Sequence, residues 1–325
     1  MPSKIGAMIA LAVVACVLAG CSKSRHGADE KYYLVSTNIK LPYWQAAGAG
    51  FSRASTKLGV PAEFVGPDTY DAKGEVDAFR KLLTRKDKPT GILVSPADPE
   101  LMKPAIDEAV AAGIPVITID SDAPSSKRLF FIGTNNYQAG LLGGDVASKK
   151  LHGKGNVVVF TMPGQVNLDE RLHGYKDAFA KTPQIRITQV IDIRGDSRIA
   201  FDTTDRMTGK KEPVDAFVCL EASACKEVAE VLDRQHIKDK VVVAMDTDDD
   251  TLNWIKKGAI AATIAQRPGT MAYMGMKMLD DLYHNKLDSL DADFGKDPLS
   301  PVPVFVDTGA TLIDQSNVDS FLSKR

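Results

Sequence analysis

Two short segments carry the residue types in this sequence that are best suited to chemistry. One apolar strand pattern ends in Asp120-Ser121-Asp122, and a second ends in Asp246-Thr247-Asp248. In an open parallel sheet, ligands bind beyond the carboxyl ends of the strands. If the two strands belong to facing sheets, Asp120 and Asp246 point into one cleft, and the pattern predicts a binding site. The alternative is that both residues cap the helices that follow their strands.

The residues required for catalysis do not form any recognisable constellation in the sequence. The five histidines show no metal-binding spacing, no GxSxG segment is present, and no glycine-rich loop joins a strand to a helix as a phosphate site requires. The acidic run 246–250 lacks the glycine and the final glutamate of a calcium loop. We therefore expect a protein that is not an enzyme, with no catalytic residue, metal or cofactor. An enzyme of unknown type is the remaining alternative.

The N-terminal 20 residues have the features of an export signal. Lys4 gives a positive start, residues 5–17 are apolar, and Leu18-Ala19-Gly20-Cys21 stands where a secretory peptidase cuts. This order resembles the lipobox of bacterial lipoproteins, which implies lipid attachment at Cys21 and anchoring to a bacterial membrane, facing the periplasm or the cell exterior. An ordinary signal peptide with a chance cysteine is the alternative. The polar residues 21–30 are expected to form a flexible tether.

The composition describes an ordinary globular chain. About 300 residues remain after the leader, which fits two domains. Lys and Arg number 40 against 42 Asp and Glu, so no charge excess indicates nucleic acid. Apart from Cys16 in the leader and Cys21 directly after it, only Cys219 and Cys225 occur, one in a strand pattern and one in the next helix. We expect two small buried hydrophobic side chains rather than a disulfide, although an oxidising compartment would permit pairing.

Apolar strand patterns alternate with amphipathic helical patterns along the mature chain. Strands are expected at 32–37, 62–65, 91–95, 115–120, 130–133, 156–160, 187–193, 214–220, 241–246 and 261–266. Helices are expected at 42–58, 76–83, 99–112, 136–151, 169–180, 201–207, 224–235 and 270–283 and, after an acidic start at 248–250, as far as 257. Buried strands separated by helices predict an α/β fold of two consecutive doubly wound parallel-sheet units.

With these segments in place, the chain resembles the type I periplasmic sugar-binding proteins of ABC importers, the ribose-binding group. The segments that carry the resemblance are 35–37 with 42–44, 114–120, 132–136, 170–175, 242–246 and 261–266. The resemblance implies two lobes joined by a hinge of three crossings and closing on a small polyol. The expected lobes are 31–134 with 267–300 and 135–266 with 301–325.

The same resemblance assigns the binding residues. The aromatic clamp falls on Tyr43 and Trp44, because an aromatic face can cover the apolar face of a sugar ring. Asp120 corresponds to the first-lobe carboxylate and Arg171 to a bidentate donor. The second-lobe and hinge contacts correspond to Asp246 and Gln266. The alternatives are core packing for the aromatic pair and a surface ion pair for Arg171.

Differences from the family pattern bear on the ligand. Ser121 stands where ribose binders have Arg, Glu221 stands where they have Asn, and Asp196 replaces an aromatic residue. The site therefore loses a cation and gains acidic groups, although Asp196 is also compatible with a position in solvent. We expect a sugar, polyol or aminosugar other than ribose.

The predicted function is that of an exported, monomeric solute-binding lipoprotein. It captures a sugar and delivers it to an ABC permease. The alternative is a sensor that presents its closed form to a chemoreceptor or kinase. A sugar-responsive repressor would need a DNA-binding segment before residue 31, where the sequence has only the leader and the tether.

Overall fold

The computed structural model describes residues 26, 27 and 29–322 of the chain. The predicted leader and the predicted lipid attachment at Cys21 lie outside these residues. No helix within the described residues combines the length and the apolar character needed to span a membrane.

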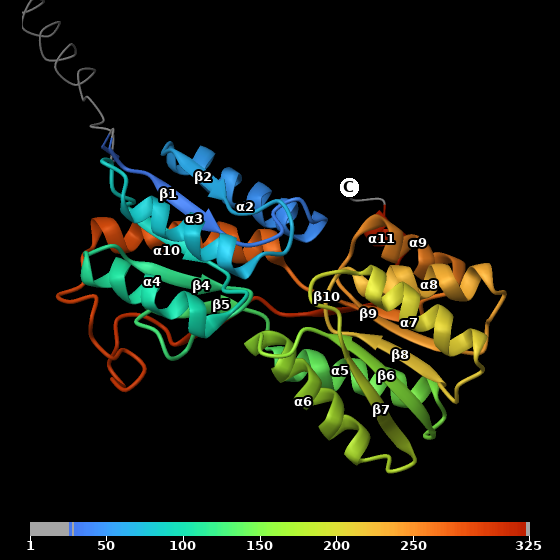
Figure 1. Cartoon of the computed structure of the whole chain (residues 1–325). Helices are drawn as coiled ribbons and strands as arrows, with labels where there is room; N and C mark the ends of the chain where they lie inside the picture. The colour runs from blue at the N-terminus through green and yellow to red at the C-terminus, as the bar shows by residue number, and fades with distance from the viewer. Residues whose placement is uncertain (1–25, 28, 323–325) are drawn as a thin grey trace, which may run out of the picture.

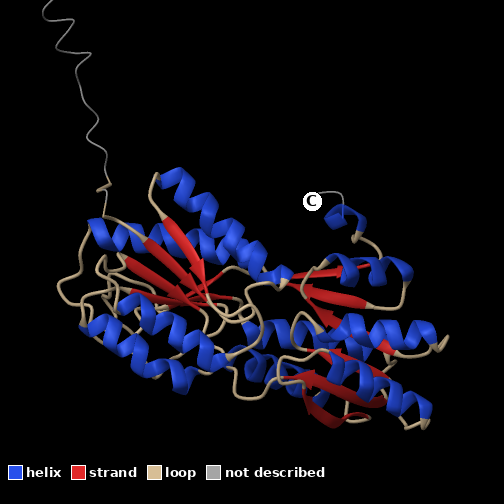
Figure 2. Ribbon diagram, turned by 45° about the horizontal axis from the view of Figure 1, so that its top comes forward, coloured by secondary structure: helices blue, strands red, loops and turns tan. Residues whose placement is uncertain are grey.

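The first lobe is a six-stranded sheet covered by helices on both faces (Figures 1 and 2). Its strand order is β11-β5-β4-β3-β1-β2, with every pairing parallel. The strands are β1 (Tyr32–Val35), β2 (Ala62–Val65), β3 (Gly91–Val94), β4 (Val116–Ile119), β5 (Phe131–Gly133) and β11 (Phe305–Asp307). The helices are α2 (Pro42–Leu58), α3 (Ala72–Leu83), α4 (Pro99–Ala111) and α10 (Pro268–His284).

The second lobe repeats this plan with the order β12-β10-β9-β8-β6-β7, in which only β12 is antiparallel to its neighbour. The strands are β6 (Gly155–Thr161), β7 (Ile185–Asp192), β8 (Ala216–Cys219), β9 (Val241–Met245), β10 (Ala262–Ala265) and β12 (Thr311–Asp314). The helices are α5 (Asn136–Lys150), α6 (Val166–Ala180), α7 (Arg198–Gly209), α8 (Ala224–Arg234), α9 (Asp249–Lys257) and α11 (Asp319–Leu322). The expected class, an α/β fold with two doubly wound lobes, is confirmed.

The chain crosses between the lobes at 134–135, at 266–267 and at 308–310, as the strand pairing shows. The last crossing differs from the boundary expected after residue 300. Strand β11 pairs with β5 and therefore belongs to the first lobe, so only the segment from β12 onward returns to the second. The sequence did not indicate β11, because it is three residues long and two of its side chains are exposed.

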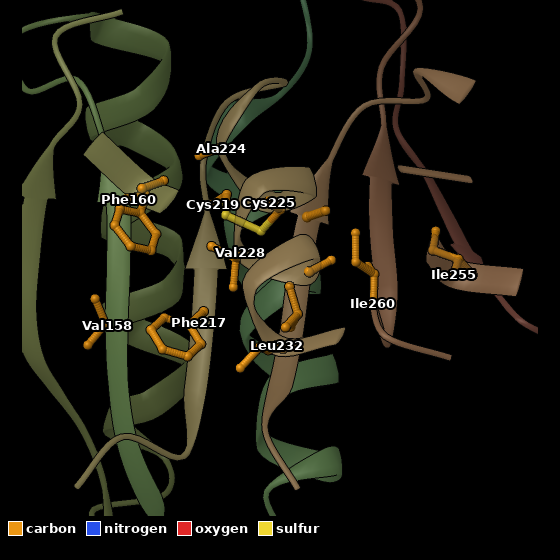
Figure 3. Packing of buried hydrophobic residues seen from close by; sticks show 14 of the residues in the cluster. Val158, Phe160, Phe217, Cys219, Ala224, Cys225, Val228, Leu232, Ile255 and Ile260 are labelled. Atoms are coloured by element: carbon orange, nitrogen blue, oxygen red, sulfur yellow. A yellow bond between two sulfur atoms is a disulfide. The ribbon is translucent and has the colours of Figure 1, made fainter. Parts of the chain in front are cut away.

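The cysteine expectation was right about burial and wrong about pairing. Cys219 and Cys225 are 0% and 2% exposed, and their sulfur atoms are bonded at 2.07 Å. Cys219 ends β8 and Cys225 lies in the first turn of α8, so the short connection brings their Cα atoms within 5.7 Å. Figure 3 shows the bridge inside an apolar cluster that includes Phe160 and Phe217.

The predicted tether is not free along its whole length. Glu30, its last residue, is 3% exposed, and its side chain contacts His284 at the end of α10. The described end of this segment therefore packs against the first lobe, a contact between positions so far apart in the chain that sequence pattern could not indicate it.

Removing the disulfide should lower stability modestly, because it closes a short loop. A loop of about seven residues corresponds to about 2 kcal/mol in the chain-entropy model. We expect a reductant to lower the free energy of unfolding of the wild type by about that amount in urea titrations. The double variant Cys219→Ala/Cys225→Ala should be insensitive to reductant. Equal sensitivity of both proteins would contradict the assignment.

Candidate functional site

The two strand-end aspartates occupy equivalent positions in the two lobes. Asp120 directly follows β4 and Asp246 directly follows β9. Both have left-handed backbone conformations, with φ of 62° and 67°. Each donates its backbone N–H to the next strand, Asp120 to Ile132 and Asp246 to Ile264, both at 3.0 Å. Aspartate is one of the few non-glycine residues that adopt this conformation readily, so the two strand ends share the same local geometry.

Helix α2 brings the predicted aromatic pair to the first-lobe carboxylate. Pro42 begins this helix, and the Tyr43 hydroxyl donates to Asp120 Oδ1 at 2.5 Å. The rings of Tyr43 and Trp44 meet edge to face at 5.2 Å, and Trp44 is 8% exposed. Both line the pocket between the lobes, and both also pack on the first-lobe core. Core and ligand roles are therefore compatible here.

Close helix packing places Arg171 in the interior of the second lobe. A Cβ atom on Gly140 of α5 would lie 2.1 Å from the Arg171 carbonyl oxygen, and one on Gly174 of α6 would lie 2.2 Å from the Tyr137 carbonyl oxygen. Only glycine permits this approach. Arg171 is 2% exposed as a result, which excludes the surface ion pair considered as its alternative.

The Arg171 guanidinium organises the hinge side of the pocket. It donates to Asn136 Oδ1 at 2.8 Å, to the Leu220 carbonyl at 2.7 Å and to Gln266 Oε1 at 2.7 Å. Gln266, at the second crossing, in turn donates to both Asp246 oxygens at 3.2 and 3.3 Å. A guanidinium has five N–H donors, so Arg171 retains capacity for a ligand.

The carboxylates in this interior have raised pKa values. Burial is the main cause for Asp120, and the charge of Arg171 partly opposes it. Burial raises the pKa of Asp246 to about 7, opposed by Arg171 and reinforced by the charge of Asp120. Burial, together with the charges of Asp120 and Asp246, also raises the pKa of Tyr43 well above its usual value, so its hydroxyl remains a donor.

The side chains of the three remaining predicted residues, Glu221, Ser121 and Asp196, are not free to contact a ligand in the pocket. Glu221 lines the pocket, but its carboxylate accepts from the Ser223 N–H and hydroxyl and from the Ala224 N–H at 2.7 to 2.8 Å, which caps α8. Ser121 is buried but does not appear among the described residues that line the pocket. Asp196 forms an ion pair with Arg198 on the surface, which agrees with the alternative that it faces solvent.

The structure adds residues that the sequence did not single out. Gln165 Nε2 donates to the Tyr70 hydroxyl at 3.1 Å, and Asn167 Nδ2 donates to Asp120 Oδ2 at 3.4 Å. Both contacts join the second lobe to the first. Ser95 also donates to Asp120, at 3.4 Å. These residues follow strands or begin a helix, but no motif marked them.

The pocket is therefore shared by both lobes and is polar on the inside. Its first-lobe lining includes Thr37, Tyr43, Trp44, Tyr70, Ser95 and Asp120. Its second-lobe and hinge lining includes Gln165, Asn167, Arg171, Glu221, Asp246 and Gln266. Among the described residues that line it, Arg171 is the sole basic side chain. Carboxylates, amides and one guanidinium around an aromatic wall suit a small ligand with many hydroxyl groups.

Comparison with known proteins agrees with this geometry. The family model described as "Periplasmic binding protein domain" matches residues 32–287. The chain is 23% identical to the ribose import binding protein of Bacillus subtilis, over 82% of this chain and 86% of that protein. It is also 23% identical to the D-allose-binding periplasmic protein of Escherichia coli, over 78% and 85% of the two chains.

Solved structures extend the comparison over nearly the whole chain. AraP, an arabinose-binding protein from Geobacillus stearothermophilus, is 32% identical with a TM-score of 0.75, covering 90% of this chain and 99% of that chain. A solute-binding protein from Burkholderia graminis, in complex with D-arabinose, is 27% identical with a TM-score of 0.81, covering 91% and 99%.

The raised pKa of Asp246 gives a prediction for the ligand-free protein. A carboxyl group with a folded-state pKa near 7 destabilises the fold as pH rises from about 4 to 7, by about 1.4 kcal/mol per pH unit. Asn tolerates the left-handed conformation and does not titrate. Asp246→Asn should therefore be more stable than the wild type in urea titrations at pH 7, and the difference should shrink toward pH 4.

The matched control is Asp68→Asn, since the Asp68 side chain is 68% exposed. It should change stability little at either pH. A difference between Asp246→Asn and wild type that is the same at pH 4 and pH 7 would contradict the raised pKa.

Proposed function

This chain belongs to the periplasmic binding protein family, and on that premise we propose that it captures a small sugar or related polyol between its two lobes, without catalysing a reaction. The observation that carries the proposal is the pair Asp120 and Asp246. They stand at equivalent strand ends of the two lobes, and both line the same pocket. A ligand with several hydroxyl groups can donate to both carboxylates at once.

The aromatic pair and the guanidinium complete the proposed recognition. Tyr43 and Trp44 offer an apolar surface to the C–H face of a sugar ring. Arg171 offers N–H donors to the ring oxygen or to hydroxyl oxygens. Direct contacts across the cleft, such as Gln165 with Tyr70, support a mechanism in which the lobes close and exclude water. Polar contacts strengthen when water is excluded, so the ligand favours the closed form.

The charged side chains that line the pocket and are not engaged elsewhere indicate the class of ligand. The sequence indicated excess acid and therefore a sugar with or without an amino group. Since Glu221 is engaged by the start of α8, Asp120 and Asp246 remain to face one Arg171. Because burial raises the pKa of Asp246 to about 7, this carboxyl group is only partly ionised at neutral pH and the pocket carries less than one net negative charge. The small net charge favours a neutral aldose, ketose or polyol over an aminosugar. The similar proteins are named for ribose, allose and arabinose. This chain has Ser121 where the resemblance places the Arg of ribose binders, and the missing cation favours a sugar other than ribose.

We place this binding in ABC import, with the closed form delivering sugar to a permease. Support comes from the relative in Bacillus subtilis, which is named as an import binding protein. A sensor role, the alternative drawn from the sequence, has no observation of its own in its favour. The leader pattern supports export, with lipid on Cys21 holding the protein at the membrane.

Binding can be measured through Trp44. The chain has two tryptophans, and Trp254 lies on α9 away from the pocket. In Trp254→Phe the fluorescence therefore reports Trp44 alone. A panel of pentoses, hexoses, polyols and aminosugars should include a neutral sugar that shifts this signal saturably. The same sugar should raise the melting temperature, since a thousandfold excess over Kd corresponds to about 4 kcal/mol.

The matched variant is Trp254→Phe/Arg171→Lys. Lysine cannot supply the three-way fork that holds Asn136, Leu220 and Gln266, so the affinity should fall by at least tenfold. No response to any neutral sugar, or turnover of a bound sugar, would refute the proposed function. Tight binding of ribose alone would refute the assignment of its ligand.

The lipid anchor is tested by Cys21→Ser. Loss of the acceptor sulfur should move the protein from the membrane fraction to the soluble extracytoplasmic fraction, because one stable lipid anchor is removed. Fractionation with immunodetection measures this. If the wild type is already soluble, Cys21 is an ordinary residue after a signal peptide.

A further inference from the structure

Four metal-ligating side chains meet at the outer end of the first lobe, far from the sugar pocket. His26 and Glu30 come from the segment before β1, and Asp280 and His284 come from the last turns of α10. One ligand atom from each lies within 4.8 Å of all the others. His26 and His284 are separated by 258 positions in the sequence, so only the fold brings them together.

The distances between these atoms match a tetrahedral metal site. Zinc binds imidazole nitrogen and carboxylate oxygen at about 2.0 to 2.2 Å, so the edges of its tetrahedron are about 3.3 to 3.6 Å. His26 Nδ1 lies 2.9 Å from Glu30 Oε2 and 3.3 Å from Asp280 Oδ1. His284 Nε2 lies 3.3 Å from His26 Nδ1, 3.1 Å from Glu30 Oε2 and 3.7 Å from Asp280 Oδ1. Two of these five distances lie within the required range, and the other three lie within 0.4 Å of it.

The two carboxylates of this cluster are buried, and hydrogen bonds from neighbouring groups fix their orientation. Glu30 and Asp280 are each 3% exposed, and buried carboxylates need a positive partner. The Gly27 N–H donates to Glu30 Oε1, which leaves Oε2 directed at the two imidazoles. The Tyr32 hydroxyl donates to Asp280 at 3.4 Å. Such outer contacts orient ligands in metal sites.

We propose that His26, Glu30, Asp280 and His284 bind one divalent transition-metal ion of the zinc type. Two imidazoles and two carboxylates suit zinc, whereas calcium and magnesium prefer six or more oxygen ligands. The bound ion would fasten His26 and Glu30 to the end of α10 and thereby hold this part of the chain against the first lobe. No residue of the sugar pocket takes part, so this inference does not depend on the proposed function.

The test uses the full chain, purified in detergent and stripped with a chelator. Zinc is titrated against a chromophoric chelator, and the expected result is one ion per chain. His26→Ala and His284→Ala should each weaken zinc binding by more than tenfold. The control His236→Ala changes an exposed histidine elsewhere and should bind as the wild type does. X-ray absorption of the zinc complex should give two imidazole and two oxygen ligands near 2.0 Å.

Each result decides between a metal site and a metal-free hydrogen-bonded network of the same histidines and carboxylates. Zinc should raise the melting temperature of the wild type and not that of His284→Ala, with both variants first shown to melt cooperatively in the chelator. Stoichiometric binding lost in both cluster variants supports the proposal. Absence of binding in the wild type, or binding retained by His284→Ala, overturns it in favour of the network. Equal stabilisation by calcium or magnesium would overturn the assignment of metal class.

Discussion

The buried guanidinium of Arg171 is the contact on which the rest of the site depends. It lies in an interior that also holds two carboxyl groups, Asp120 and Asp246, and its charge lowers the cost of ionising both. Its hydrogen bonds join α5, the end of β8 and the second crossing, and through Gln266 they reach Asp246. The glycines that let α5 and α6 approach are therefore part of the binding chemistry, because they determine where this cation stands. Replacing such a buried cation leaves buried acceptors without partners, which costs far more than the loss of one contact.

The two lobes place an aspartate at the cleft by the same local structure. In each, a strand that is buried at every position except Val241 of β9 is followed by an aspartate with positive φ. The side chain of this aspartate lines the pocket, while its backbone N–H remains bonded to the next strand. Strained positions of this kind persist when the surrounding sheet determines them. Burial raises the pKa of both aspartates, so the ligand-free pocket carries an energetic cost that hydrogen-bond donors on a ligand would offset. The same two side chains therefore lower the stability of the ligand-free protein and raise its affinity for a hydroxyl-rich ligand.

Much of this arrangement was predictable from the sequence, and the exceptions have physical reasons. Strand β9 is a continuous apolar run and β4 is interrupted only by Thr118. Such runs are typical of a sheet covered on both faces, and this placed the aspartates after them at a sheet edge. The contact of Asn167 with Asp120 depends on how two lobes meet, and no local pattern encodes it. The role of Glu221 as a cap required the geometry of the turn before α8. The disulfide could not be predicted from the pattern, because two buried thiols and a buried disulfide leave the same signal in a strand and the following helix. The contact of His26 with His284 could not be predicted either, because 258 positions separate them in the sequence.

A crystal structure of the complex with the neutral sugar that binds most tightly tests the central claim most directly. The account predicts one sugar between the lobes, with hydroxyl groups within hydrogen-bond distance of both Asp120 and Asp246 and one ring face against Tyr43 or Trp44. It also predicts that Arg171 keeps its bonds to Asn136 and Gln266. A sugar bound on one lobe alone, or outside this pocket with the two aspartates uninvolved, would contradict it.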